Sequence, residues 1–329
     1  MMDFLKPEPK WALDELRAIT MVAGAARNGL GQPQRAVLGA LQRSLLGTES
    51  DVDTLAPIDT EDLISIGMDG AQARQLIRLM VVVSVAEGAP SEEQVRLMST
   101  FASALCVEEP AVRVVGHLAK GRVMRFKFAF ARHAHIRIYM RNTRKLHGGI
   151  LQAMRAVLRF RGVLPEDAAL AARFHAFGDF SEETLGYHFY RHCRDADLPF
   201  SGEKGGFPMG ALYHDFTHVL AGYDTSPEGE MKAAAFQAGF TTDPDDFFTV
   251  LFALIIHTAG INLTPFEMPV LLGRIGQGQL AMEVLHALER GAATKVDLGC
   301  GWNFWEDVNV PIDAVRERLG ISPLQPEIV

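Results

Sequence analysis

The sequence predicts an all-α protein, and three observations support this fold class. Apolar residues recur at intervals near 3.6 from residue 11 to about residue 109, which is the period of amphipathic helices. Several segments open with a helix-capping pattern, for example Pro90-Ser91-Glu92-Glu93. No run of β-branched strands separated by hairpin turns occurs anywhere in the 329 residues.

The first domain is expected at residues 1–110, as a set of short helices with a weak internal repeat. Val22–Arg35 aligns with Val82–Val95, and Asn28-Gly29 falls opposite Glu87-Gly88. The pattern resembles the TerB-like domain of tellurite resistance, whose two halves carry Asp-Gly and a following Glu for metal binding. Glu87 and Glu93 match that pattern, but Asn28 and Gln34 replace its acids in the first half. We therefore expect a small helical module without a cation site.

A basic linker of helices is expected at residues 111–165. Thirteen Lys or Arg residues and no Asp or Glu lie between Pro110 and Pro165. Because the net charge of the whole chain is −8, the remaining residues together carry a net charge of −21. Apolar residues such as Phe126, Phe128 and Ile136 alternate with these cations. Two interpretations remain open: docking onto an anionic membrane surface, or a solvated linker whose arginines pair with acidic neighbours. No nucleic-acid partner is expected, because the chain is acidic and has no binding motif.

The second domain is expected at residues 166–329, where helix boundaries are clearly marked. Asp243-Pro244-Asp245-Asp246 combines an N-cap, a proline at the first helical position and two acids, and it precedes the apolar helix Phe247–Ile256. That helix, with Met268–Leu272, is a candidate wall for an apolar tunnel, or else ordinary core. Asn309–Gly320 has proline near its start and glycine just past its end, as helices often do.

Composition places the chain among soluble globular proteins. Hydrophobic residues make up 48% and charged residues 22%, an ordinary balance for a folded domain. Three dispersed cysteines, Cys106, Cys193 and Cys300, favour a reducing compartment and argue against a disulfide framework or a thiolate zinc site. The N-terminus does not resemble a signal peptide, and Phe247–Ile256 is about half the length of a membrane span. We expect a cytoplasmic protein that can sit peripherally on the inner face of the membrane.

The sequence also predicts one metal centre. Tyr213–Leu220 is expected to form a helix that ends at Gly222, and on it His214 and His218 lie four residues apart on one face, with Asp215 beside them. Glu230 follows on a second helix, which begins at Pro227 and can fold back antiparallel. Two imidazoles and two carboxylates suit zinc, or alternatively iron(II), better than calcium. His214, Asp215, His218 and Glu230 are therefore the predicted ligands and catalytic residues.

The surroundings of these four residues resemble the coenzyme Q (ubiquinone) biosynthesis protein four family. That family carries H-D-x-x-H followed after eleven residues by Glu, and the resemblance is carried at its centre by His214, Asp215, His218, Gly222, Thr225, Gly229 and Glu230. Looser matches are Leu185-Gly186-Tyr187, Tyr190-Arg191, Gly291, Trp302–Glu306 and Arg316–Ile321, so the resemblance covers about residues 165–322.

The resemblance implies a helical fold, a zinc-like ion and a role in ubiquinone biosynthesis. The implied activity is metal-dependent oxidative decarboxylation of a polyprenylated 4-hydroxybenzoate-type precursor, or organisation of other ubiquinone-biosynthesis proteins at the membrane. Two alternatives remain: a non-catalytic isoprenoid-lipid-binding scaffold with a structural metal, and a His-Asp type metal phosphohydrolase. The latter would need further ligands, for which only His257, His286 and Asp297 are candidates. The oligomeric state is open, with a homodimer as one alternative.

Overall fold

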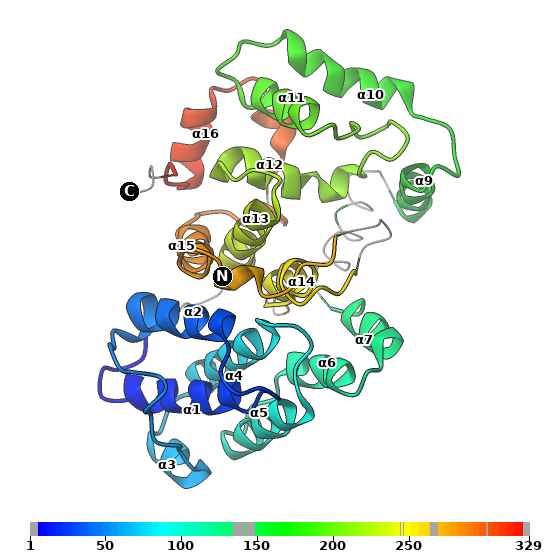
Figure 1. The fold of residues 1–329 in the computed structure, drawn as a ribbon. Helices are drawn as coiled ribbons and strands as arrows, with labels where there is room; N and C mark the ends of the chain where they lie inside the picture. Colours follow the sequence, from blue (N-terminus) through cyan, green and yellow to red (C-terminus); the bar gives the residue numbers. More distant parts are fainter. Residues whose placement is uncertain are drawn as a thin grey trace. The chain divides into compact units, whose positions relative to one another are not determined.

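The computed structural model describes residues 6–133, 142, 149–243, 245, 247–263, 269–300 and 302–324. All regular secondary structure within these ranges is helical. Backbone pairing of the β type is limited there to isolated bridges, such as the one between Thr184 and Pro311. The all-α prediction is confirmed (Figure 1). No helix among the described residues is both long enough and apolar enough to cross a membrane.

The chain forms two compact units, and each is discontinuous in sequence. The N-terminal unit comprises Asp3–His133 and Phe247–Glu289, and the C-terminal unit comprises Met1–Met2, Ala134–Asp246 and Arg290–Val329. The domains predicted at 1–110, 111–165 and 166–329 are instead contiguous, since they follow composition and motif. That division stays a prediction about sequence similarity, whereas the units describe packing.

Short helices build the N-terminal unit. Its elements are α1 (Ala12–Gly24), α2 (Gln32–Leu41), the π-helical turn η1 (Gln42–Leu46), α3 (Thr60–Ser65), α4 (Gly70–Val85), α5 (Glu92–Ala104), α6 (Pro110–Ala119), α7 (Val123–Phe130), α14 (Phe247–His257), the short 3-10 helix η4 (Arg274–Gly276) and most of α15 (Leu280–Ala292). The capping pattern at residues 90–93 is confirmed, because the Ser91 side chain accepts a hydrogen bond from the amide of Gln94 at the start of α5.

The internal repeat has a structural counterpart in this unit. α1 and α2 are joined through Gly29, and α4 and α5 through Gly88, and both glycines have positive φ angles. Each second helix has a glutamine at its third position, Gln34 or Gln94, whose side-chain oxygen accepts a hydrogen bond from the N-cap amide. The two halves therefore share a glycine with positive φ between the helices and a glutamine that closes the start of the second one.

The apolar helix α14 is a core element of the N-terminal unit. All but one of its residues are buried, it packs against α4, and the ring of Phe248 lies 5.3 Å from that of Phe130. The predicted helix is confirmed, although Pro244 and Asp246 of its predicted cap lie outside the described residues. Its role as a tunnel wall stays a prediction, and Met268 of the accompanying segment is also outside those residues.

The C-terminal unit contains the predicted metal-binding segment. Its elements are α9 (Ile150–Phe160), α10 (Ala168–His175), the short 3-10 helices η2 (Ala176–Asp179) and η3 (Met209–Ala211), α11 (Leu185–Asp195), α12 (Leu212–Ala221), α13 (Pro227–Phe240), the short 3-10 helix η5 (Phe304–Glu306) and α16 (Ile312–Leu319). α12 packs against both α11 and α13, and α16 packs against α11. α12 is therefore held between two neighbours.

An aromatic cluster fixes α12 in this unit. The fully buried ring of Phe216, in the middle of α12, stacks on Phe189 of α11 at 4.2 Å and on Phe304 at 4.7 Å. Trp302 meets the edge of Phe216, and Trp305 packs on Phe304 and on nearby rings of α10 and η2, so both half-buried tryptophans border this cluster. Aromatic packing of this kind leaves α12 little freedom to rotate.

Candidate metal centre

The site lies where α12 turns back into α13. Gly222, as predicted, ends α12 in the left-handed conformation at φ 79°, and its amide donates to the carbonyl of His218 at 2.8 Å. Arg316 donates to the carbonyls of Val219 and Leu220, which caps the last turn of the helix. These contacts fix both the end of α12 and the direction in which the chain leaves it.

The loop into α13 is equally tight. The hydroxyl of Ser226 caps α13 by accepting from the amide of Gly229 at 3.1 Å. A Cβ atom at Gly229 would lie 2.0 Å from the carbonyl oxygen of Asp224, so only glycine permits this close approach. The turn therefore determines where Glu230, the next residue, enters the site.

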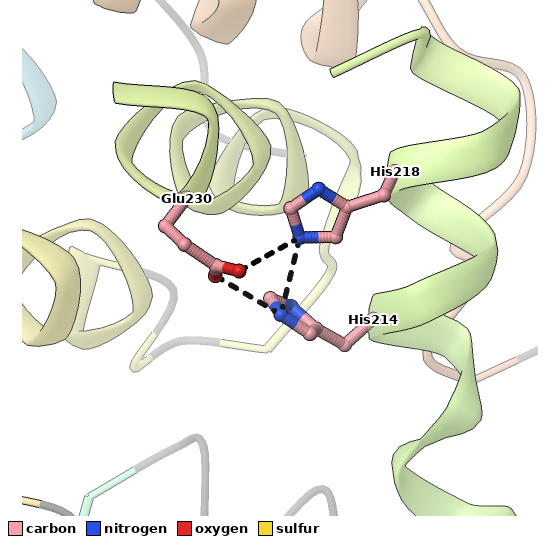
Figure 2. Close-up of side chains that lie close together, drawn as sticks. All are labelled: His214, His218 and Glu230. Carbon is pink, nitrogen blue, oxygen red and sulfur yellow. Dashed lines mark hydrogen bonds and ion pairs between the residues drawn. The ribbon is translucent and has the colours of Figure 1, made fainter. Parts of the chain in front are cut away.

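Three side chains from the two helices converge, as Figure 2 shows. The Nε2 atoms of His214 and His218 are 3.3 Å apart, and the Glu230 carboxylate lies 3.3 Å from the first and 3.5 Å from the second. One ligand atom from each of the three lies within 4.8 Å of the others. The predicted convergence of both histidines with Glu230 is present in the structure.

Both imidazoles are held from behind, through Nδ1. Nδ1 of His218 lies 3.2 Å from the backbone carbonyl of Tyr223, which can only accept, so Nδ1 carries the proton and donates it there. Nδ1 of His214 lies 2.9 Å from the side-chain amide of Gln237 on α13. Both Nε2 atoms are therefore turned toward Glu230, which is how metal-binding histidines are commonly oriented by outer partners.

The side-chain amide of Gln237 can contact Nδ1 of His214 in two orientations, in which its oxygen and nitrogen exchange places. With its nitrogen next to Nδ1, its buried oxygen finds no hydrogen-bond partner within the described part of the chain. With its oxygen there, it accepts the Nδ1 proton and leaves the Nε2 lone pair of His214 for a ligand. The second orientation matches the arrangement at His218.

The electrostatics of the site are dominated by the Glu230 charge. Burial by itself lowers the pKa of His214, but the hydrogen bond and charge of Glu230 outweigh it and raise this pKa to about 9. Burial likewise raises the pKa of Glu230, whereas its hydrogen bonds with His214 and His218 lower it further, to well below the usual carboxyl range. The buried carboxylate of Glu230 therefore favours a positive charge beside it, either a proton on His214 or a bound metal cation.

The group can accommodate a tetrahedral zinc ion. Bonds of about 2.0–2.1 Å from zinc to nitrogen and oxygen place neighbouring ligands of a tetrahedron roughly 3.3 Å apart. The two Nε2 atoms, 3.3 Å apart, match that edge, and each faces a different oxygen of the Glu230 carboxylate, Oε2 at 3.3 Å for His214 and Oε1 at 3.5 Å for His218. The side chains of His214 and Glu230 are 28% and 27% exposed, so a ligand can reach the site from outside. The donor set therefore fits the expected metal.

The fourth predicted ligand, Asp215, is not part of this group of converging atoms. It lies one residue from His214 and is buried, which raises its pKa, while the two histidines lower it and Glu230 raises it. After burial itself, Asp215 is the largest cause of the raised pKa of Cys193 on α11. Its role as a metal ligand stays a prediction.

Two further residues of the site were not predicted from the sequence. His192 on α11 stacks near His218, with ring centroids 5.5 Å apart, and its buried Nε2 has no hydrogen-bond partner among the residues that the structure describes. Burial, then the neighbouring histidines, lower the pKa of His192 to about 4, so it is neutral at neutral pH. Gln237 could have been found, because it lies seven residues, or two helical turns, after Glu230 on the same face. His192 had no such signal.

The comparisons with known proteins include a distant structural match. No family model matches the chain, and no curated protein matches it. A search of solved structures finds the crystal structure of a putative ubiquinone biosynthesis protein from Nostoc punctiforme, with 20% identity and a TM-score of 0.35, covering 64% of this chain and 94% of that chain. At this TM-score the match carries no argument about fold or function. None of the comparisons supports the TerB-like resemblance of residues 10–110.

Proposed function

We propose that the C-terminal unit binds one divalent cation through His214, His218 and Glu230, with zinc as the expected ion and iron(II) as the alternative. The observation that carries this proposal is the convergence of three ligand atoms within 4.8 Å. The outer contacts at both Nδ1 atoms support it, because they direct both Nε2 atoms at an anionic carboxylate, where a bound cation would displace the proton that Glu230 holds on His214. A set of three protein ligands with an open position is typical of catalytic zinc sites.

The substrate class we propose is an aromatic acid with a prenyl chain, of the 4-hydroxybenzoate type. This part rests on the sequence motif from His214 to Glu230 and its resemblance to the ubiquinone family. When bound, the cation would act as a Lewis acid toward the carboxylate or phenolate of such a substrate. Glu230 would offset part of the metal charge, and Gln237 would keep His214 aligned.

The proposed reaction replaces the ring carboxylate by a hydroxyl group and releases carbon dioxide. It is a two-electron oxidation, so the assay must contain dioxygen, which accepts the two electrons and leaves as hydrogen peroxide while water supplies the oxygen of the new hydroxyl group. His192, which is neutral and stacks beside His218, is an additional group near the site that can accept or donate a proton. Organisation of other ubiquinone-biosynthesis proteins by the same unit is compatible with this role.

The metal proposal is tested by equilibrium competition for zinc against a chromophoric chelator. His218→Ala and Glu230→Gln each remove one donor, and both are expected to weaken zinc binding by about 100-fold or more. His175→Ala is the matched control, because His175 pairs with Glu203 at 2.8 Å elsewhere in this unit, outside the group of three. Equal zinc affinity in all these proteins would contradict the proposal.

The substrate proposal is tested by release of labelled carbon dioxide from a prenylated 4-hydroxybenzoate carrying the label in its carboxylate. Release that depends on metal, dioxygen and His218 is the expected result. Metal binding without release would contradict the enzymatic role and favour a lipid-binding scaffold with a structural metal. Phosphoester hydrolysis abolished by Asp215→Ala would instead favour the His-Asp phosphohydrolase.

A further inference from the structure

Outside the candidate metal centre, one helix of each compact unit, α7 in the N-terminal unit and α9 in the C-terminal unit, carries exposed apolar side chains next to cations. We propose that each of these helices docks onto an anionic lipid bilayer, with its apolar side chains inserted among the lipids and its arginines on the headgroups. The proposal does not depend on the metal or on the proposed reaction.

α7 presents large apolar side chains to solvent. Met124 is 63% and Phe128 is 68% exposed, and they lie four residues apart, so they are neighbours on one helical face. Phe126 and Phe130 point the other way and are buried, which anchors the helix to the N-terminal unit. Exposing a phenylalanine and a methionine together is costly in water, and such patches commonly mark interaction sites.

Cations surround this apolar face. Arg122 and Arg125 are exposed on the first turn of α7, beside Met124. Next to them a groove of about 400 Å³ runs between α5 and α6, and its lining includes Arg113, His117 and Lys120. Its one acidic lining residue is Glu109, whose carboxylate is occupied by Arg78 at 2.9 Å. The groove therefore offers net positive charge beside the apolar face.

α9 shows the same pattern in the C-terminal unit. Leu151, Met154 and Leu158 recur at intervals of three and four and are 64%, 53% and 37% exposed. Ala153 is buried on the opposite side. Phe160 anchors the end of the helix by stacking on Phe207, with ring centroids 5.0 Å apart. α9 is thus an amphipathic helix whose large apolar side chains face outward.

Charge complementarity identifies the occupant as an anionic bilayer. Both helices lie in the segment from Pro110 to Pro165, which has thirteen Lys or Arg residues and no Asp or Glu. Exposed Leu, Met and Phe flanked by Arg are typical of helices that lie in the plane of a membrane interface. A purely electrostatic partner would need the arginines but would gain nothing from the apolar stripe, and this difference makes the proposal testable.

The test is co-sedimentation of the full-length protein with vesicles. Binding is expected to vesicles of equal parts phosphatidylcholine and phosphatidylglycerol, and to be much weaker with phosphatidylcholine alone. Neutralising two charges by Arg122→Gln with Arg125→Gln is expected to weaken binding roughly 30-fold. Replacing the apolar pairs, Met124→Ser with Phe128→Ser on α7, or Leu151→Ser with Met154→Ser on α9, is expected to weaken it by about tenfold each.

The matched control is Ile64→Ser on α3. Ile64 is 52% exposed like the tested residues, but it follows Glu61 and Asp62, so the proposal expects no effect on vesicle binding. Far-ultraviolet circular dichroism checks that each variant keeps its helices. Absence of binding to the anionic vesicles would overturn the proposal. If one apolar double substitution leaves vesicle binding unchanged, the helix that carries it is excluded as a docking element. If both leave binding unchanged, the proposal is overturned and an electrostatic partner such as an acidic protein or RNA is indicated instead.

Discussion

At the scale of single residues, the site depends on which atom of His214 faces Glu230. The sequence predicts that His214 and His218 share a helical face, since four residues make just over one turn. It does not predict which ring nitrogen points inward, because Gln237 and the carbonyl of Tyr223 decide that orientation. The ligand types could therefore be predicted, whereas their alignment could not.

Gln237 provides a residue-scale prediction. Gln237→Leu removes the acceptor behind His214 and is expected to weaken zinc binding by roughly 10–100-fold, as is typical for outer partners of metal ligands. Gln237→Glu keeps an acceptor for the Nδ1 proton and is expected to retain zinc binding. Zinc competition and circular dichroism measure both effects. Equal weakening by the two substitutions would show that Gln237 acts through packing alone.

The position of Asp215 marks a limit of reasoning from spacing. Residues 214, 215 and 218 lie within an arc of about 100° on an ideal helix, so a shared cation is geometrically allowed. In the structure the neighbouring histidine reaches the group of three, but Asp215 does not. A step of one residue turns a side chain by about 100°, which is enough to direct it away from the position that its neighbour occupies.

At the scale of elements, start and stop signals located helices well. The proline and acid patterns correctly predicted α5, α13 and α16, and Gly222 correctly predicted the end of α12. Such signals are local, since they depend on backbone groups within one turn. The burial of α14 against α4 is long-range, and no local pattern could have predicted it.

Gly222 gives the first element-scale prediction. Its φ of 79° is strained for any residue with a Cβ, so Gly222→Ala is expected to reduce the free energy of unfolding by about 1–2 kcal/mol. Gly24→Ala is the control, because Gly24 ends α1 without a positive φ and nothing lies within 4 Å of its added Cβ. Denaturant unfolding compares the two. Equal stability would mean that the turn after α12 is not strained by alanine.

The second element-scale prediction concerns the buried carboxyl of Glu15 on α1. Burial raises its pKa from 4.5 to about 7, so the folded state holds this proton more tightly than the unfolded state. Its stabilising contribution is therefore full below the unfolded pKa and is lost as the pH rises through about 7. This loss amounts to about 3 kcal/mol at most.

Glu15→Gln mimics the protonated carboxyl at every pH. We expect the variant to be more stable than the wild-type protein at about pH 8 but not at about pH 5, where the wild-type carboxyl is already protonated in the folded state. Denaturant unfolding at both values measures the difference. A stability difference that does not change with pH would contradict the burial-raised pKa of this group.

At the scale of the whole molecule, the chain assembles its two compact units from separated stretches. Phe247–Glu289 joins the N-terminal unit, whereas Arg290–Val329 joins the C-terminal one. Composition and motifs describe neighbours in sequence, so they could predict the acid-free segment and the metal motif but not this exchange. For this reason the domains predicted at 1–110, 111–165 and 166–329 are contiguous in sequence, whereas the two compact units are not.

The metal-centre proposal and the membrane-docking proposal concern different parts of the molecule. The candidate metal centre lies wholly within the C-terminal unit, while the docking residues lie on one helix of each unit. The acid-free segment accounts for the uneven charge of the chain, because it leaves −21 on the remaining residues. Failure of vesicle binding would leave the metal proposal untouched, and the reverse also holds.

The most direct test of the metal centre is native mass spectrometry with elemental analysis of the full-length protein after incubation with zinc. Our interpretation predicts one zinc ion per chain, and its near-complete loss in the His218→Ala variant, whose helix content is expected to be unchanged. A wild-type protein that retains no more zinc than this variant would contradict a metal centre at His214, His218 and Glu230.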